Sequence, residues 1–405
     1  MTLWFIGRLL SVSELKNADR PYLSLGGVFP YSRNMKATLL RAWHEAAGAR
    51  FAPFAGFDMP IQYPAGAVEE HRLCRRGAGF FDIDHMGQFI ISSKGAGEAL
   101  SALVSNRILD MKEAEARYAL LLNESGGVID DLFIYRMNRD EAEDGWFVVV
   151  NAGNRELDYA WFRERLPKGV GLEDVSDSVY MISVQGPQAL RLLDSVSGGA
   201  LSAIPRSSMV MTRIMGLPVR MGRTGYTGED GAELFYDAGK ARELWEFLLA
   251  EAGRLGIEAG PVGLAARDSL RFEAGMPLHG HEISPDITPP EALLSWACDF
   301  EKEFTGKASL LAQKERGLRR KLVTLNVKGG VPREGYAVLS GDGLELGRCV
   351  AGMFCPTTGT YSANAFVPPD YAKPGTVLAV SIRGGAKEAT VIKRPLYIPV
   401  YRRSV

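Results

Sequence analysis

Apolar residues recur along this chain with two different periods, and the changes of period predict its elements. Helical spacing predicts helices near residues 39–47, 66–76, 97–104, 155–165, 188–196 and 240–255. Short apolar runs bounded by turn residues predict strands near residues 80–83, 87–91, 118–122, 128–135 and 146–150. The stretch 51–60, aromatic and interrupted by prolines, predicts a loop. Helices and strands therefore intermix, which indicates an α+β or α/β fold.

The pattern changes at about residue 319. Short apolar runs separated by Gly, Pro and Asp predict strands at residues 321–327, 345–353, 377–382 and 387–393. This arrangement is typical of a small antiparallel barrel or sandwich. The charged stretch 313–320 lacks apolar periodicity and predicts a domain boundary near residues 312–320. We expect a disordered extension over residues 1–34 with Met35 as the working start, a main region over residues 35–316, and a barrel over residues 317–405.

Length and charge restrict the classes of protein that this chain can belong to. Its 405 residues suggest two to four domains. A net charge of −1 without a long basic stripe argues against nucleic acid as a partner. No apolar run is long enough to span a bilayer, so we expect no membrane segment.

The cysteines and histidines give little sign of a metal site. Cys74, Cys298, Cys349 and Cys355 are scattered, with no Cys-x-x-Cys pair. This spacing argues against a disulfide framework and a structural zinc site, and it favours free thiols in a reducing compartment. His279 and His281 fall on one face of a predicted strand. Without a clear third ligand they give only a weak indication of a metal site.

Two adjacent carboxylates, Asp130 and Asp131, lie on the predicted strand that follows the turn at Gly126 and Gly127. Strand residues alternate faces, so one carboxylate can face solvent while the other points to the interior. An inward carboxylate is costly unless it is paired, hydrogen-bonded or in use. The alternative is that both aspartates cap backbone at the end of the strand.

Two glycine-containing segments carry charged residues suited to a ligand. Three glycines precede Glu233, and an inward carboxylate there can accept from a flat ring with two adjacent N–H donors. A solvated glutamate on a glycine-rich hairpin is the alternative. The segment 263–275 predicts a short helix with Arg267 and Arg271 one turn apart. Arg267 can bind a carboxylate or oxo group, or it can pair internally with Asp268 or Glu273.

Polar residues at two strand ends complete the candidates. Asn151 ends an apolar strand, where its amide can donate and accept toward a polar ring. Strand-ending turns also use Asn for backbone reasons. The polar turn 82–88 can present His85 and Met86 to a ligand, or it can be an ordinary capped turn. Walker, dinucleotide-binding, serine-elbow and zinc-helix signatures are absent from the chain.

Together these segments resemble the T-protein of the glycine cleavage system, an aminomethyltransferase. The resemblance runs from about Met35 to the C-terminus. It is carried by the segments Phe54-Ala-Gly-Phe-Asp-Met-Pro60, His85-Met86-Gly87, Asn123–Asp131, Arg223–Gly231, Gly263–Asp268 and Ser295-Trp296.

The resemblance implies a three-domain cloverleaf, in the α+β class, around a channel that holds tetrahydrofolate as acceptor substrate. By motif position it implies catalysis by Asp131, pterin binding by Glu233 and folate binding by Arg267. It also implies a folate pocket lined by Tyr118, Asn151 and Tyr226, with Tyr401 as a looser match. The implied partner is the lipoylated H-protein, and the implied location is the cytoplasm, or the mitochondrial matrix in a eukaryote.

The implied reaction moves a one-carbon unit from a dihydrolipoyl sulfur to folate and releases ammonia. A carboxylate can orient the attacking folate nitrogen and accept or relay its proton. Positioning and proton movement are enough for this displacement, so we expect no metal.

One residue departs from the family pattern. Asp84 stands where the family usually has Ser, and an added charge there could raise the pKa of a neighbouring carboxylate. It leaves open a folate-dependent demethylase of a small methylated donor. A non-catalytic folate-binding protein that aids iron–sulfur cluster assembly is a third interpretation, disfavoured because the segment 272–281 lacks that group's cysteine.

Overall fold

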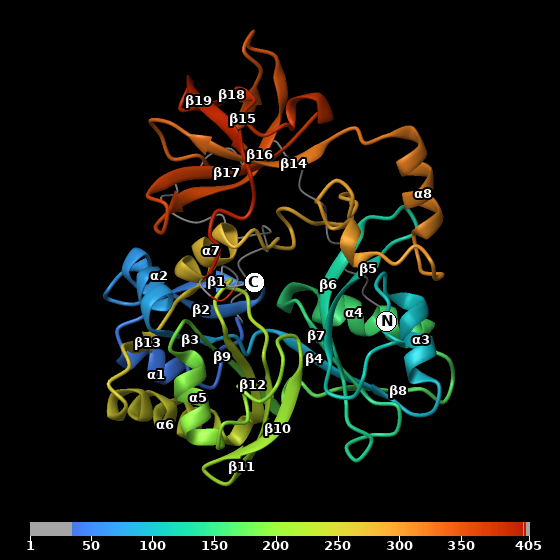
Figure 1. The fold of residues 1–405 in the computed structure, drawn as a ribbon, viewed down its shortest axis with the longest axis vertical. Helices are drawn as coiled ribbons and strands as arrows, with labels where there is room; N and C mark the ends of the chain where they lie inside the picture. The colour runs from blue at the N-terminus through green and yellow to red at the C-terminus, as the bar shows by residue number, and fades with distance from the viewer. Residues whose placement is uncertain (1–34, 400, 402–405) are drawn as a thin grey trace, which may run out of the picture.

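The chain forms three lobes in the computed structural model, which describes residues 35–399 and residue 401 (Figure 1). Two lobes combine helices with an open sheet, and the third is a closed barrel. The predicted extension over residues 1–34 lies outside the described residues. Within the described part of the chain, no helix has the length and apolar character needed to cross a bilayer.

The first lobe is built on a six-stranded sheet with the order β10-β11-β12-β9-β3-β13. Its strands are β3 (Ala78–Asp82), β9 (Val179–Gln185), β10 (Met209–Ile214), β11 (Leu217–Gly222), β12 (Gly231–Asp237) and β13 (Ala259–Pro261). Only β13 pairs in parallel, with β3. The helices of this part of the chain are α1 (Arg41–Ala46), α2 (Ala67–Arg76), α5 (Ala189–Ser197), α6 (Ala241–Arg254) and α7 (Leu264–Glu273).

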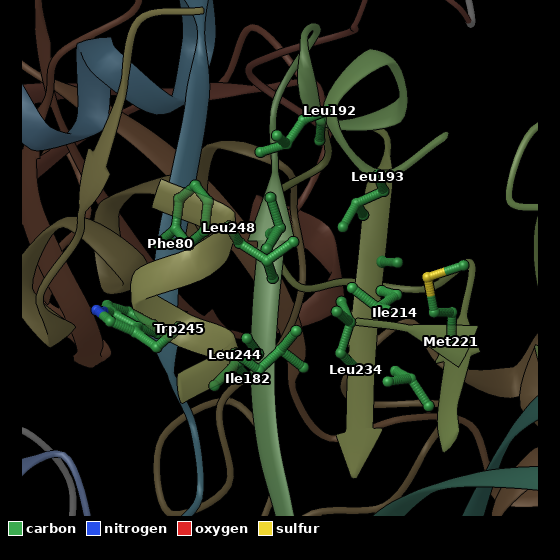
Figure 2. Close-up of a cluster of buried hydrophobic side chains, with 14 of the residues drawn as sticks. Phe80, Ile182, Leu192, Leu193, Ile214, Met221, Leu234, Leu244, Trp245 and Leu248 are labelled. Carbon is green, nitrogen blue, oxygen red and sulfur yellow. The ribbon is translucent and has the colours of Figure 1, made fainter. Parts of the chain in front are cut away.

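Helix α6 covers one face of this sheet. Its buried residues Leu244, Trp245 and Leu248 recur at a spacing of three or four and form one apolar stripe. Figure 2 shows that stripe packed over Phe80 of β3 and Ile182 of β9. This core holds β9 and β12 in place, and β12 continues to the candidate site.

The second lobe is built on a five-stranded antiparallel sheet with the order β5-β6-β7-β4-β8. Its elements are β4 (Gly87–Ser92), β5 (Ala116–Leu122), β6 (Val128–Arg136), β7 (Trp146–Val150), β8 (Gly171–Asp174), α3 (Ala96–Leu103) and α4 (Arg155–Arg165). Helices α3 and α4 pack on one face of the sheet. The other face meets the first lobe, where the rings of Phe147 and Phe235 lie 5.0 Å apart.

The third lobe is a closed six-stranded barrel with the order β14-β17-β16-β15-β18-β19. Helix α8 (Lys307–Arg316) leads into β14 (Lys321–Val327), β15 (Ala337–Leu339), β16 (Glu345–Cys355), β17 (Thr360–Val367), β18 (Val377–Ile382) and β19 (Gly385–Ile392). The predicted barrel and its four predicted strands are confirmed, while β15 and β17 are additional. Residues 313–316 belong to α8 rather than to an irregular linker.

The barrel is tied to the C-terminal end of α7. The backbone N–H groups of Leu396 and Tyr397 donate to the Glu273 carbonyl oxygen at 2.8 and 3.0 Å. The N–H of Thr357 donates to Glu273 Oε1 at 2.8 Å, and its hydroxyl contacts His71 Nε2 at 2.8 Å. Helix α7 therefore links the barrel to the first lobe, as its position in Figure 1 also shows.

The loop prediction for residues 51–60 is wrong. This stretch forms a hairpin of β1 (Arg50–Phe54) and β2 (Phe57–Gln62), with φ values of 48° and 83° at Ala55 and Gly56. Two residues with positive φ are what a tight hairpin turn requires. Prolines are tolerated because both strands are edges of a two-stranded sheet.

The prediction for the cysteines is confirmed, whereas the strand predicted through two histidines does not form. All four cysteines are buried free thiols, as predicted. The predicted strand through His279 and His281 does not form, since only His279 makes an isolated bridge, to Ile283. His281 instead bonds through Nδ1 to the Val350 carbonyl oxygen at 2.7 Å.

The α6 stripe generates a stability prediction. Leu244→Ala should lower the free energy of unfolding by about 2–5 kcal/mol, because it opens a cavity in a closely packed core. Leu157→Ala makes the same deletion where the side chain is 52% exposed, and it should cost less than about 0.5 kcal/mol. Urea unfolding followed by circular dichroism compares the two; equal midpoints would contradict this packing.

Candidate active site

Six of the seven predicted site residues line one cavity of about 920 Å³. Its walls come from both α+β lobes and from the segment after the barrel that contains Arg394 and Pro395. The six residues are Tyr118, Asp131, Asn151, Tyr226, Glu233 and Arg267. Tyr401 does not line this cavity; its hydroxyl donates to the Gly228 carbonyl oxygen at 2.9 Å.

Strand β6 directs its two adjacent carboxylates to opposite sides. Leu132 and Ile134 belong to the core under α3 and α4, so Asp130 points to that side. Asp131 points to the cavity. The turn before β6 requires glycine, because a Cβ on Gly127 would lie 1.8 Å from the Pro285 carbonyl oxygen.

Asp131 is held by two donors. Asn151 Nδ2 donates to its Oδ1 at 2.6 Å, and the Tyr118 hydroxyl donates to its Oδ2 at 3.1 Å. Burial and the nearby charge of Asp130 raise the pKa of Asp131 to about 7. A carboxyl group with that pKa can accept and release a proton near neutral pH.

The alternation of strand residues allowed one of the two aspartates to face solvent, but Asp130 does not. Its side chain is 0% exposed. It accepts from the Asn151 backbone N–H at 2.9 Å, from Asn151 Nδ2 at 2.9 Å and from Asn154 Nδ2 at 2.6 Å. The capping alternative therefore describes Asp130, whereas Asp131 accepts from the side chains of Asn151 and Tyr118.

Glu233 stands on β12 as a hydrogen-bonded group rather than a solvated hairpin residue. Its Oε2 accepts from Thr224 Oγ1 at 2.6 Å and from the Tyr135 hydroxyl at 3.3 Å. Burial raises the pKa of Glu233. Among the described residues no donor reaches Oε1, so this oxygen is free to accept from a ligand in the cavity.

The internal ion pair that the sequence suggested for Arg267 is made by Arg271 instead. Arg271 pairs with Asp268 and with Glu282, each at 2.8 Å. Arg267 has no carboxylate within ion-pair distance in the described part of the chain, and its guanidinium lies 5.0 Å from the Tyr226 ring. One arginine of this helix is structural, and the other keeps its donors for the cavity.

Aromatic rings form much of the remaining wall. The Tyr118 ring stacks on Trp296 with centroids 5.3 Å apart and an interplanar angle of 27°, and Trp296 is 65% exposed. The Tyr226 hydroxyl donates to the Pro277 carbonyl oxygen. Such an exposed, stacked indole is suited to cover a flat ligand.

The turn that follows β3 presents its histidine and methionine to the cavity, as one interpretation of the sequence proposed. His85 is 3% exposed, and its Nδ1 has no hydrogen-bond partner among the described residues. Burial and the charge of Arg267 lower the pKa of His85 to about 3, so the imidazole is neutral. Its ring lies 5.3 Å from that of Phe54.

Two family models match the chain. One, described as the GCVT N-terminal domain, matches residues 40–302. The other, described as the glycine cleavage T-protein C-terminal barrel domain, matches residues 320–397. The chain belongs to the glycine cleavage T-protein family.

Relatives of known name support the family assignment. An aminomethyltransferase of Synechococcus elongatus is 40% identical, over 87% of this chain and 93% of the relative. One of Saccharopolyspora erythraea is 41% identical, over 89% of this chain and 98% of the relative. The crystal structure of the glycine cleavage system aminomethyltransferase T from Bartonella henselae superimposes with a TM-score of 0.83. That protein is 34% identical, over 90% of this chain and 99% of its own. The predicted family, fold and enzyme class, an aminomethyltransferase, are confirmed.

The departure from the T-protein family pattern at Asp84 lies outside the cavity. Its Oδ1 accepts from the Met181 N–H at 3.1 Å. Burial, and then the charge of Asp82, raise the pKa of Asp84 to about 9. The carboxyl group is therefore neutral near pH 7. The predicted extra charge near the site stays a prediction, but the raised pKa of Asp84 and its position outside the cavity weaken the reason for the demethylase alternative.

No role was predicted from the sequence for three neighbours of the site, two of them inside motifs that carry the family resemblance. Thr224 and Tyr135 hold Glu233, and Trp296 was recognised in a motif without a role. In the described residues no cluster of three or more His, Cys, Asp or Glu side chains is arranged to hold a metal ion.

Asp84 generates a pH-dependent stability prediction. Its folded pKa, about 9, lies above its ordinary value of 3.8, so the folded protein retains a proton that the unfolded chain releases. The stability of the native protein therefore falls as pH rises between these values. Asp84→Ser removes this term and should raise Tm by a margin that grows from pH 5 to pH 8.

Differential scanning calorimetry across this pH range measures the margin. Asp140→Ser removes an exposed carboxylate and serves as the control, for which the difference from wild type should stay constant with pH. A constant difference for Asp84→Ser as well would contradict the raised pKa of Asp84.

Proposed function

We propose that this protein transfers the aminomethyl carbon of S-aminomethyldihydrolipoyl H-protein to tetrahydrofolate. The products are 5,10-methylenetetrahydrofolate, ammonia and the dihydrolipoyl carrier. Both folate nitrogens bond to the transferred carbon as its bonds to sulfur and to the amine nitrogen break. The two protons released by the folate nitrogens go to ammonia and to the thiol.

The main support for the proposal is the position of Asp131. It lies in the wall of a cavity that is large enough for the reacting parts of both substrates. The carboxyl group has two fixed donors, Asn151 and Tyr118, and a pKa of about 7. A base tuned close to neutral pH can take the proton of an attacking folate nitrogen and pass it to the departing amine. Fixed donors also hold the carboxylate in one orientation, which positions the reactants.

The remaining residues supply complementary contacts for a reduced folate. Glu233 Oε1 can accept from the N–H groups of a pterin edge. Arg267 can donate to an oxo or carboxylate group. Tyr118, Trp296 and Tyr226 offer apolar ring surfaces, and Asn151 offers its amide oxygen.

The proposal that the H-protein is the carrier, and the expected location in the cell, rest on similarity to the family. A lipoyl arm must reach the cavity from outside, so the H-protein has to dock around the cavity mouth. The expected cytoplasmic location stays a prediction, as do the role of Tyr401 and the boundaries at residues 34 and 316.

An ammonia-release assay tests the reaction directly. Purified protein with aminomethylated H-protein and tetrahydrofolate should release ammonia and form methylenetetrahydrofolate in equal amounts. A panel of small methylated amines supplied with tetrahydrofolate should give no turnover. Turnover with a methylated amine and none with the carrier would instead establish the demethylase.

Asp131→Asn should reduce kcat by roughly two orders of magnitude or more, because the amide keeps the shape of the group but cannot accept the proton. In the native protein, activity should fall as pH drops below about 7, where Asp131 becomes protonated. Steady-state kinetics with a circular dichroism check of folding measures both effects. A folded variant with turnover close to wild type would remove Asp131 from the mechanism.

Glu233→Ala should weaken tetrahydrofolate binding by about 1.5–3 kcal/mol if the carboxylate bonds to the pterin. Isothermal titration calorimetry under anaerobic conditions gives the affinity. Glu229→Ala is unsuitable as a control because Glu229 pairs with Arg75, whereas the exposed Glu243 offers a neutral comparison through Glu243→Ala. Unchanged affinity in the Glu233 variant would argue against its pterin contact.

A further inference from the structure

A fully buried carboxyl group lies behind the catalytic strand, outside the cavity. Asp158 on α4 is 0% exposed, and neither of its oxygens accepts a hydrogen bond from any N–H or O–H group among the described residues. No cation pairs with it there. An ionised carboxylate in such a place would be left without compensation, which costs far more than a neutral carboxyl group.

The group that faces Asp158 is the Asp130 carboxylate. The two carboxyl groups interact at hydrogen-bonding range, and the charge of Asp131 acts on Asp158 more weakly. Asn154 precedes Asp158 by one helical turn, so both approach Asp130 from the same face of α4. Two carboxylates cannot both be ionised at this separation, and a proton between them turns repulsion into a hydrogen bond.

The hydrogen bonds of Asp130 determine which partner holds the proton. A carboxylate has about four acceptor sites. Three of those on Asp130 are filled by N–H donors: Asn151 N–H on Oδ2, and the Asn151 and Asn154 amides on Oδ1. Asp158 has no such donors. The anion is therefore stabilised on Asp130, and the proton is retained by Asp158; burial and the charge of Asp130 raise the pKa of Asp158 to about 11.

We propose that Asp158 is a proton-holding positioning residue: its carboxyl group stays protonated, donates to Asp130, and keeps Asp130 ionised beside Asp131. The O–H of Asp158 fills the fourth acceptor site of Asp130. The ionised Asp130 then fixes the Asn151 amide, whose second N–H holds Asp131. Its negative charge also contributes to the near-neutral titration of Asp131. The kinetic part of this inference rests on the proposed function; the protonation state does not.

Infrared spectroscopy of the whole protein tests the protonation state without any substrate. A protonated carboxyl group has a C=O stretch well separated from carboxylate bands. The spectrum of wild type minus Asp158→Asn at pH 8 in heavy water should show one such band. Glu156→Gln removes an exposed carboxylate from the same helix and should leave this region unchanged. Absence of the band in the Asp158→Asn difference spectrum would overturn the proposal.

Kinetics tests the consequence for Asp131. Asp158→Asn keeps a neutral N–H donor to Asp130, so its kcat and pH profile should stay close to wild type. Asp158→Leu removes the donor, so the Asp130 carboxylate holds the Asn151 amide less firmly, and Asn151 in turn holds Asp131 less firmly. Because the Asn151 bond lowers the pKa of Asp131, the acidic limb of activity should then move to higher pH, by up to roughly one unit, with KM for tetrahydrofolate unchanged.

The outcomes separate the alternatives. A merely structural Asp158 would change stability or KM in the leucine variant and leave the acidic limb in place, which would overturn the tuning role. If the leucine variant does not fold, the asparagine variant still decides, since a shifted acidic limb there would contradict a neutral donor. A wild-type protein that shows the infrared band but releases no ammonia would remove the proposed reaction and leave the protonated Asp158 standing.

Discussion

The site depends on holding two adjacent carboxylates of one strand on opposite sides of a sheet, Asp130 fully buried and Asp131 in the cavity wall. Asn151 makes this possible, because its side-chain amide donates both to Asp130 on the interior side and to Asp131 on the cavity side. Its backbone N–H gives Asp130 a further bond. The residue that ends β7 thus couples the reacting carboxyl group to the interior of the second lobe. Asn151 therefore ties the end of β7 to β6.

Much of the fold follows from local pattern. The α6 stripe and the apolar run of β7 are visible in the sequence, and each became the expected element with ends within a few residues. The strands that the pattern did not predict depend on their pairing partners more than on their own residues. Phe51 to Pro60 forms a hairpin because two edge strands need few ladder bonds. The three-residue strand β15 takes its conformation from its barrel neighbours.

The candidate site was predictable where residue type and position on an element were enough. Asp131 on a glycine-led strand and Arg267 in the first turn of α7 are of this kind. The protonation of Asp84 could not be predicted from the sequence, because the burial and the Asp82 charge that raise its pKa come from the fold. Asp158 carried one local signal, an acid four residues before the buried Phe162 on an otherwise apolar helix face. Its partner on β6 could be recognised only once the helix was placed on the sheet.

Helix α7 makes different contacts at its two ends, one with the cavity and one with the segment after the barrel. Its first turn presents Arg267 to the cavity, while Glu273 at its last turn receives the chain that leaves the barrel. A rigid helix transmits a displacement of one end to the other. Shortening the chain before Leu396 would therefore be felt some two turns away, at the guanidinium that faces the ligand. The segment that leaves the barrel thus acts on the cavity twice, through Arg394 and Pro395 in its wall and through the bonds that hold the end of α7.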